Sequence, residues 1–491
     1  MDDVRPGEPA LSQQTVVLLT LILYKVALLG IGFWAARRMR GEDDFFVGGR
    51  GVGGLVSGLS YAASTSSAWV LLGFSGFVYT AGLSALWMVP GILGGYVVMW
   101  VVIAPRLSGE ARAKSHVTLT DYLTDGLGVP GAKAVAALST ALTLFCFVFY
   151  IAAQFDAAAK AFTDQFALGQ TEALLLGAGV ILIYSLMGGY WAVSVTDTLQ
   201  GFVMAAVAIG LPLAALIAAG GPAGVSAALA AAPSDYGTAA GGRGAMAFTG
   251  FVLGVLAIGL GPFGQPHLHA RLMSLKDEPA RRRGFVLAMG WAVIVYAGMA
   301  TLALAGRALT GGALADGEVL FYRLAADVLP PILAGIVIAA ILSAVMSTVD
   351  SILLSAAASV AHDLGFTKGH PARALLISRS VMAAIAVLSV ALALSLPDSI
   401  FNRVLFAWSA LGAAFGPLVL ARVAGRRPGT ATTLLAIALG FGVTVLFYVL
   451  GTTASDDLLS RAARLDGDSF ERLVPWVVPL ALLFASPRRS V

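Results

Sequence analysis

Charged side chains are scarce in this sequence of 491 residues: they make up 12% of it, whereas hydrophobic residues make up 58%. Soluble domains carry about 25% charged residues. A water-soluble globular protein is therefore excluded. A series of soluble domains joined by polar linkers is excluded as well, because apolar runs recur from Thr15 to Leu483 with only short polar breaks.

Metal-binding and nucleotide-binding patterns are also missing. The five histidines show no HExxH or paired-cysteine spacing, and His267 and His269 fall in what reads as a basic loop. The only cysteine, Cys146, lies within an apolar run, so we interpret it as a packing residue. No Walker A sequence occurs, which argues against transport driven by ATP within this chain. The net charge of +4 comes from loop arginines and does not indicate a nucleic-acid partner.

The apolar runs predict an all-α, polytopic membrane protein with about 13 transmembrane helices, since each span needs about 20 apolar residues. The first run is too long for a signal-peptide core and lacks a cleavage pattern after it, so we expect it to remain in the mature protein. The predicted spans are 14–36, 51–80, 83–105, 131–162, 172–190, 195–219, 246–266, 284–306, 331–361, 373–396, 403–422, 430–451 and 472–486.

Loop arginines and lysines predict the orientation. With the N-terminus outside and the C-terminus in the cytoplasm, the cytoplasmic segments hold more than twice as many Lys and Arg as the external ones, as the positive-inside rule requires. The basic segments on that side are 37–50, 106–114, 271–283 and 422–427, with Arg488 and Arg489 in the tail.

Two predicted spans are poor continuous helices. Span 51–80 contains Ser64, Thr65, Ser66 and Ser67 in a row, and span 246–266 is interrupted by glycines and Pro262. Such clusters free backbone carbonyls, which a neighbour, water or a cation must satisfy, and discontinuous helices in matching positions point to a binding site at the membrane midplane. The alternative is that small residues merely allow helices to pack closely.

Asp350 is the most informative carboxylate, because it lies deep in an apolar span. Helical spacing puts Ser347, Asp350 and Ser351 on one face, with Ala344 and Thr348 on a neighbouring stripe. A charge at the bilayer centre costs at least about 2.5 kcal/mol and needs a partner. Sodium is one candidate, since hard cations prefer oxygen ligands; an arginine from another helix, or protonation, is the alternative.

Other polar residues allow two interpretations each. Asp197 begins a span, where Asp commonly caps a helix, or it could bind an ion. Asp156 and Lys160 have the spacing of an intrahelical ion pair, which we favour over a transport role. Trp69, Tyr150 and Gln265 lie in or beside the broken regions. They could line a solute pocket with apolar faces and polar tips, or pack in the core.

At these residues the sequence resembles the sodium/solute symporter family, and within it the bacterial sodium/proline symporters. Six ordered motifs carry the resemblance over most of the chain. They are DFFVGGR (44–50), LSYAASTSSAW (59–69), SVTDTLQ (194–200), FGQPH (263–267), AVMST (344–348) and GAAFGP (412–417).

The resemblance implies the leucine-transporter-like fold in a single transmembrane domain, 1–491. Two inverted five-helix repeats would span 51–219 and 246–422, with accessory C-terminal helices in 430–491. It also implies Na+ as the coupling ion and no organic cofactor. Sodium would bind the carbonyls of Ala63, Ser66 and Ala344 and the hydroxyls of Ser347 and Thr348, and a candidate second sodium would bind Asp197, Ser347, Asp350 and Ser351.

The solute pocket implied by the resemblance comprises Ser67, Trp69, Tyr150, Ile258, Pro262 and Gln265. Proline transporters of this type have an aspartate where Thr65 stands, and a tryptophan and a tyrosine where Ile258 and Pro262 stand. These departures put the details of sodium coupling, and proline itself as the solute, in question. The expected solute is an amino acid such as proline, or a monocarboxylate.

The function expected from these features is sodium-coupled symport of a small organic solute across the inner membrane, with no enzymatic step. Proton coupling through Asp350 or Asp197 is the main alternative. A membrane sensor is disfavoured because nothing soluble follows the last span, and two hydroxyl-rich breaks that meet at an ion site argue for occlusion over a passive pore. Membrane lipid is an expected partner, and the oligomeric state stays open.

Overall fold

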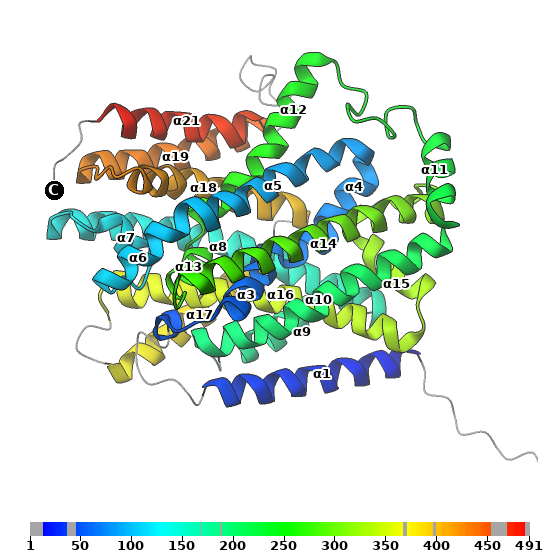
Figure 1. The fold of residues 1–491 in the computed structure, drawn as a ribbon. Coiled ribbons are helices and arrows are strands. Elements are labelled where there is room, and N and C mark those ends of the chain that lie inside the picture. The colour runs from blue at the N-terminus through cyan, green and yellow to red at the C-terminus, as the bar shows by residue number, and fades with distance from the viewer. Residues whose placement is uncertain are drawn as a thin grey trace, which may run out of the picture.

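The computed structural model describes residues 13–36, 46–166, 168–186, 189–366, 371–395, 399–452 and 469–486. Within these ranges the regular structure is helical, apart from one isolated parallel bridge between Val52 and Leu275. The predicted all-α fold is confirmed for this part of the chain. The long helices lie side by side along roughly one direction, with α1 at one edge and α19 and α21 at the opposite edge (Figure 1).

The α-helices have the following bounds: α1 Gln13–Ala36, α3 Gly54–Ala68, α4 Ser75–Ala81, α5 Met88–Val97, α6 Ala104–Lys114, α7 Leu119–Thr124, α8 Val129–Phe166, α9 Gln170–Ser185, α10 Tyr190–Ala218, α11 Gly221–Ala231, α12 Ala245–Ala257, α13 Pro266–Met273, α14 Glu278–Thr310, α15 Leu320–Val328, α16 Pro331–Ala358, α17 Pro371–Ser395, α18 Ile400–Val423, α19 Thr430–Thr452 and α21 Ser469–Ala485. Short 3₁₀-helical segments join or extend them: η1 Gly48–Arg50, η3 Gly82–Trp87, η5 Ile258–Gly264 and η6 Gly317–Val319. Short π-helical segments do the same: η2 Trp69–Phe74, η4 Val98–Ile103 and η7 Ser359–Asp363.

Nine helices in the described ranges are long and apolar enough to cross a membrane. One of them, the helical stretch Gly54–Lys114, contains two predicted spans, and Gly82 at φ 67° separates them. The shorter apolar helices Leu18–Ile31, Gln170–Ile183 and Arg472–Ala485 coincide with three more. The chain is thus a multi-pass membrane protein, and the number 13 stays a prediction.

The predicted break in the first broken span is present at Ser67. This residue has φ 50° and ψ −173°, a backbone conformation that residues with a side chain seldom adopt, and it ends the regular helix α3. Its own hydroxyl accepts the N–H of Trp69 at 3.0 Å, and Gln154 of α8 accepts the N–H of Ala68 at 3.2 Å. Side chains therefore satisfy two of the backbone donors at the break.

The second broken span is also interrupted as predicted. Helix α12 passes into the 3₁₀ turn η5, Gln265 is extended, and the chain then resumes as α13. The sequence-based placement of His267 and His269 in a basic loop was wrong, because both residues lie in α13 and are buried. Pro266 at the first turn of α13 explains the restart, since proline is well suited to that position.

The glycines of the second break also serve close packing. A Cβ on Gly259 would lie 1.9 Å from the carbonyl oxygen of Gly91 in α5, and one on Gly264 would lie 1.9 Å from that of Leu411 in α18. Both distances are far below any real Cβ contact. The break and the packing, posed as alternatives from the sequence, are therefore two properties of one segment.

Backbone hydrogen bonds tie the beginning of α3 to the end of α13. The N–H of Val52 donates to the oxygen of Ser274 at 3.1 Å, and the N–H of Lys276 donates to the oxygen of Val52 at 3.0 Å. In addition, the Ser57 hydroxyl donates to the oxygen of Arg271 at 3.2 Å. The α3 half of the first broken span is thus joined to the α13 half of the second.

Helices α16 and α18 are the most buried candidate spans among the described residues. Near the end of α8, Asp156 pairs with Arg403 of α18, while Lys160 pairs with Glu318 at 2.7 Å and Asp316 at 2.9 Å. The predicted Asp156–Lys160 ion pair was therefore wrong. The buried side chains of Arg403 and Glu318, on other elements, are stronger partners than a neighbour along the same helix surface, whose contact contributes only about 0.2–0.5 kcal/mol.

Candidate functional site

The break in α3 faces the polar stripe of α16. The Thr348 hydroxyl lies 3.4 Å from the carbonyl oxygen of Ser64, and the Ser64 hydroxyl lies 3.2 Å from that of Ser347. All three side chains are fully buried. Residues far apart in the sequence thus bring one hydroxyl of α16 against the backbone of α3 and a second against a side-chain hydroxyl of α3.

Carbonyl oxygens are available at this contact because a helix that ends leaves the carbonyls of its last turn without partners in the helix. The left-handed residue Ser67 produces such an end within the protein interior. The other residues predicted to hold sodium belong to the same two elements and are also fully buried: Ala63, Ser66 and Ala344. Carbonyl and hydroxyl oxygens in a dry site suit a hard cation.

Asp197 does not cap a helix. It lies inside α10, which begins at Tyr190 and has Gly189 at its N-cap position, and its side chain is fully buried. Its Oδ2 instead pairs with the Arg271 guanidinium at 2.7 Å and accepts the Ser60 hydroxyl at 2.7 Å. The capping interpretation was wrong because the helix extends further toward the N-terminus than the apolar run indicates.

Ser64 links the residues predicted for the second sodium. Its hydroxyl lies 3.3 Å from Asp197 Oδ2, 3.2 Å from Ser347 Oγ and 3.1 Å from Ser351 Oγ. Three of the four predicted residues are therefore within reach of one hydroxyl. The fourth, Asp350, accepts a hydrogen bond from Ser185 at the end of α9.

Aromatic rings lie next to the break in α3. The Trp69 ring stacks on Phe401 with centroids 5.6 Å apart and on Trp408 with centroids 6.5 Å apart. Tyr150 meets Trp408 edge-on at 6.5 Å and His267 at 6.4 Å. Trp69 and Tyr150, predicted separately, are thus joined through Trp408.

Several polar tips in this region are buried without a hydrogen-bond partner in the protein. They include both amide atoms of Gln265, both ring nitrogens of His267 and the indole nitrogens of Trp69 and Trp408. Buried polar atoms are nearly always satisfied, so such a group of exceptions is typical of a site for a polar ligand. The remaining predicted pocket residues, Ser67, Ile258 and Pro262, are buried at the two breaks.

Comparison with known proteins agrees with this geometry. The sequence model of the sodium:solute symporter family matches residues 45–447. The chain belongs to the sodium:solute symporter family. This symporter family comprises transporters rather than enzymes.

Curated relatives of this symporter are named proline transporters. The osmoregulated proline transporter OpuE of Bacillus subtilis is 30% identical over 89% of this chain and 90% of its own length. The sodium/proline symporter of Escherichia coli is 30% identical over 88% of each chain.

Solved structures show the same fold. A Na+-coupled sialic acid symporter in a substrate-bound outward-open state superposes with a TM-score of 0.76 at 17% identity, covering 97% of this chain and 99% of its own. Mhp1, a nucleobase-cation-symport-1 family transporter, superposes with a TM-score of 0.55 at 11% identity, covering 90% and 94%. The predicted leucine-transporter-like fold is confirmed.

Some residues at the candidate site were missed from the sequence. Ser60 and Ser64 lie in the motif 59–69 but were given no site role, and Gln154 carries no signal of its own in the sequence. Arg271 was assigned to a cytoplasmic basic segment, yet its side chain is only 2% exposed. It lies four residues after the motif FGQPH (263–267), and nothing in its local sequence distinguishes it from the basic residues that follow.

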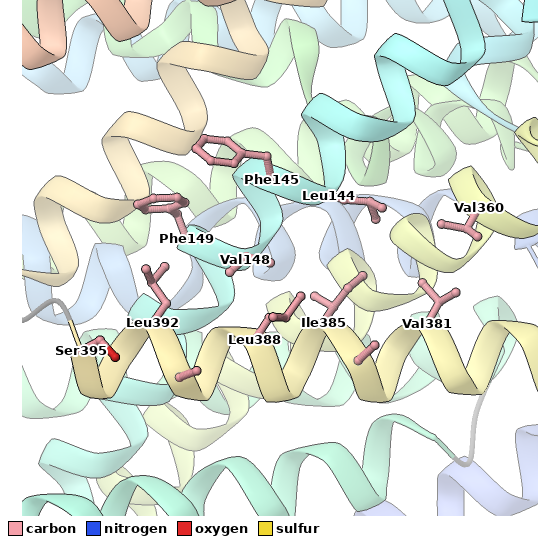
Figure 2. Close-up of a pocket in the computed structure, with 12 residues that line it drawn as sticks. Leu144, Phe145, Val148, Phe149, Val360, Val381, Ile385, Leu388, Leu392 and Ser395 are labelled. Atoms are coloured by element: carbon pink, nitrogen blue, oxygen red, sulfur yellow. The ribbon is translucent and has the colours of Figure 1, made fainter.

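A separate groove lies between α8 and α17 of the symporter, with a volume of about 670 Å³. Figure 2 shows its aliphatic and aromatic lining, in which Ser395 is the one polar residue drawn. None of the predicted site residues lines it. An apolar groove of this kind lacks the polar groups that would orient a charged solute.

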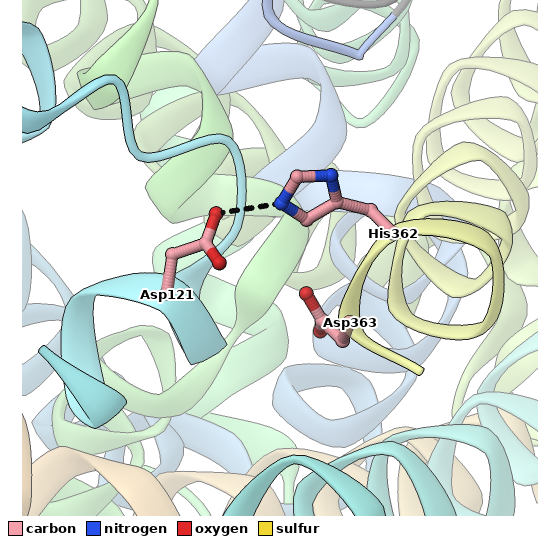
Figure 3. Close-up of side chains that lie close together, drawn as sticks. All are labelled: Asp121, His362 and Asp363. Carbon is pink, nitrogen blue, oxygen red and sulfur yellow. Dashed lines mark hydrogen bonds and ion pairs between the residues drawn. The ribbon is translucent and has the colours of Figure 1, made fainter. Parts of the chain in front are cut away.

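A cluster of possible metal ligands, Asp121, His362 and Asp363, joins α7 to η7 (Figure 3). His362 Nε2 lies 3.0 Å from Asp121 Oδ2, and the Thr118 hydroxyl donates to Asp363 at 2.6 Å. Burial raises the pKa of Asp121, but the hydrogen bonds from His362 and from the N–H of Val117 and of Thr118 outweigh it, so the pKa is lowered. Sequence spacing could not reveal this cluster, because its members come from distant segments.

Proposed function

We propose that this protein is a sodium-driven symporter that carries a small organic solute into the cell. The observation that supports it best is the contact between the broken helix α3 and the hydroxyls of α16, where Thr348 Oγ1 lies 3.4 Å from the oxygen of Ser64. Membership of the sodium:solute symporter family supports the same reaction.

The proposed coupling ion is Na+, bound by five oxygens at this contact. They would be the carbonyls of Ala63, Ser66 and Ala344 and the hydroxyls of Ser347 and Thr348. The site needs dehydrated sodium, and the full burial of these residues supports that requirement. The candidate second sodium at Asp197, Ser347, Asp350 and Ser351 is part of the proposal.

The proposed solute is an amino acid such as proline, or a monocarboxylate, held by Ser67, Trp69, Tyr150, Ile258, Pro262 and Gln265. The unpaired amide of Gln265 and the stacked rings of Trp69 and Trp408 support a solute with one polar and one apolar part. The names of the curated relatives support proline. Thr65 argues against proline, because proline transporters of this type have an aspartate at this position. The Thr65 hydroxyl instead donates to the backbone oxygen of Tyr61 at 2.6 Å.

In the proposed cycle, sodium stabilises the outward-open state, the solute completes the core, and the bundle that contains the two broken helices rocks against the remaining helices. The two repeats would be 51–219 and 246–422, with 430–491 as accessory helices. We place the protein in the plasma membrane with its N-terminus outside. The basic residues at 37–45, 488 and 489 that contribute to this orientation lie outside the described residues.

The test uses purified protein in liposomes and in detergent. Thermal shift with amino acids, monocarboxylates, sugars and vitamins, each with and without sodium, is expected to give a sodium-dependent stabilisation by one class. Ser347→Ala should raise the sodium concentration needed for uptake of that solute. Uptake driven by a pH gradient without sodium would establish proton coupling instead, and uptake indifferent to both gradients would establish a passive pore.

A further inference from the structure

Arg271 places a positive charge in the interior of the protein, beside the candidate ion sites. Its side chain is 2% exposed, and its Nη2 lies 2.7 Å from Asp197 Oδ2, 2.6 Å from Ser64 Oγ and 2.5 Å from Ser351 Oγ. Its Nε donates to the Ser60 hydroxyl at 2.9 Å. One terminal nitrogen with two N–H groups therefore faces three oxygens.

These oxygens are largely those predicted for the second sodium. Asp197 and Ser351 contact the guanidinium directly, and Ser347 is connected to it through the Ser64 hydroxyl. Two cations cannot share one set of oxygens at hydrogen-bonding distance, because their mutual repulsion is strong in a medium of low dielectric constant. With the guanidinium in this position, sodium is excluded from these ligands.

Asp197 nevertheless keeps an oxygen for a second partner. Its Oδ1 is buried and has no hydrogen-bond partner, although Oδ2 has several. A fully buried carboxylate is costly unless it is paired, and a buried oxygen without a partner requires an explanation, of which a bound ion is one. The carboxylate can thus pass from the guanidinium to an ion without losing all its contacts.

We propose that Arg271 is a built-in competitor of the second sodium ion: it holds Asp197 and Ser351 when the ion is absent and releases them when sodium binds. This inference rests on the proposed sodium-coupled function and assigns the control of its second ion. The guanidinium also joins four helices, since its contacts lie on α3, α10 and α16 while Arg271 itself is on α13. Exchange of arginine for sodium therefore loosens α13 from α10 and α16.

The decisive variant is Arg271→Gln, which removes the competing charge and leaves the Asp197 carboxylate for sodium. Sodium is titrated against thermal stability in detergent, and against uptake in liposomes. The half-saturating sodium concentration is expected to fall by at least about tenfold, because a positive charge has left the neighbourhood of the ion. Arg323→Gln is the matched control, as Arg323 is 61% exposed and pairs with Asp327, and it should leave the titration unchanged.

Two double variants protect the test against misfolding and against indirect effects. Arg271→Gln with Asp197→Asn removes both buried charges, so it should fold and show no gain in sodium affinity. Arg271→Gln with Ser351→Ala should lose most of the gain. Unchanged or weaker sodium binding by folded Arg271→Gln, or a gain that persists without the Asp197 carboxylate, would overturn the inference. A wild-type protein that does not respond to sodium would overturn the proposed function instead.

Discussion

Replacing Gly264 by alanine tests whether the close approach of η5 and α18 shapes the proposed solute site. The added Cβ would lie 1.9 Å from the oxygen of Leu411, whereas an ordinary contact begins at 3.4 Å, so the two segments must separate by about 1.5 Å. The obstructing atoms are backbone and cannot turn aside. Overpacking of this kind costs about 1–3 kcal/mol of stability.

The same displacement would reach the proposed solute site, because Gln265 follows directly and η5 packs against α18, which carries Trp408. We expect Gly264→Ala to lower the thermal unfolding temperature and to weaken solute binding, with each 1.4 kcal/mol of strain felt in the bound state costing tenfold in affinity. Solute titrations by thermal shift at saturating sodium measure both effects.

Gly290→Ala is the control for this variant. Gly290 lies within α14 with nothing within 4 Å of an added Cβ, so alanine there should be neutral or stabilise by up to about 1 kcal/mol. If Gly264→Ala matches Gly290→Ala in both stability and solute affinity, the helices do not approach as described and the reasoning fails.

Three further predictions concern other residues. Thr348→Ala should raise the half-saturating sodium concentration about tenfold while leaving the fold intact, because the proposed site would lose one of about five ligands; an unchanged sodium titration would exclude Thr348 from the site. Trp69→Ala should weaken solute affinity more than sodium affinity, and normal solute binding by a poorly expressed variant would instead indicate a packing role. Because the pKa of Asp121 is lowered in the fold, its stabilising effect is present above the ordinary Asp pKa of about 4 and is lost as the pH falls through its lower folded-state value. Asp121→Asn should therefore be less stable than wild type at neutral pH and show less loss at acid pH, which melting curves between pH 3 and 7 would measure; equal acid sensitivity would contradict the assignment.

Composition and local pattern were sufficient to predict the membrane fold and both breaks. Long apolar runs have no stable alternative to helices in a membrane, and a run of four hydroxyl residues ending at Ser67 is unusual in a continuous membrane helix. The stripe containing Ser347 and Thr348 was likewise readable, because helical periodicity fixes which residues share a face.

Partners from distant segments were not predictable in this way. Asp156 has a helical neighbour at the right spacing, yet it pairs with Arg403, which is 247 residues away. Arg271 precedes a cluster of loop arginines and follows a glycine-rich break, so composition assigned it to the loop. The eight residues of α13 are too few to give a helical signal, and only tertiary packing buries them.

The backbone bonds between Val52 and the segment Ser274–Lys276 have a mechanical consequence. Side-chain contacts can slide by changing rotamer, whereas paired backbone groups buried from water hold their register until both bonds break together. The adjoining parts of α3 and α13 must therefore move together as one rigid unit. If sodium binds at α3 as proposed, a displacement of α3 would also move the helix that carries Arg271, so the two proposed ion sites would move together.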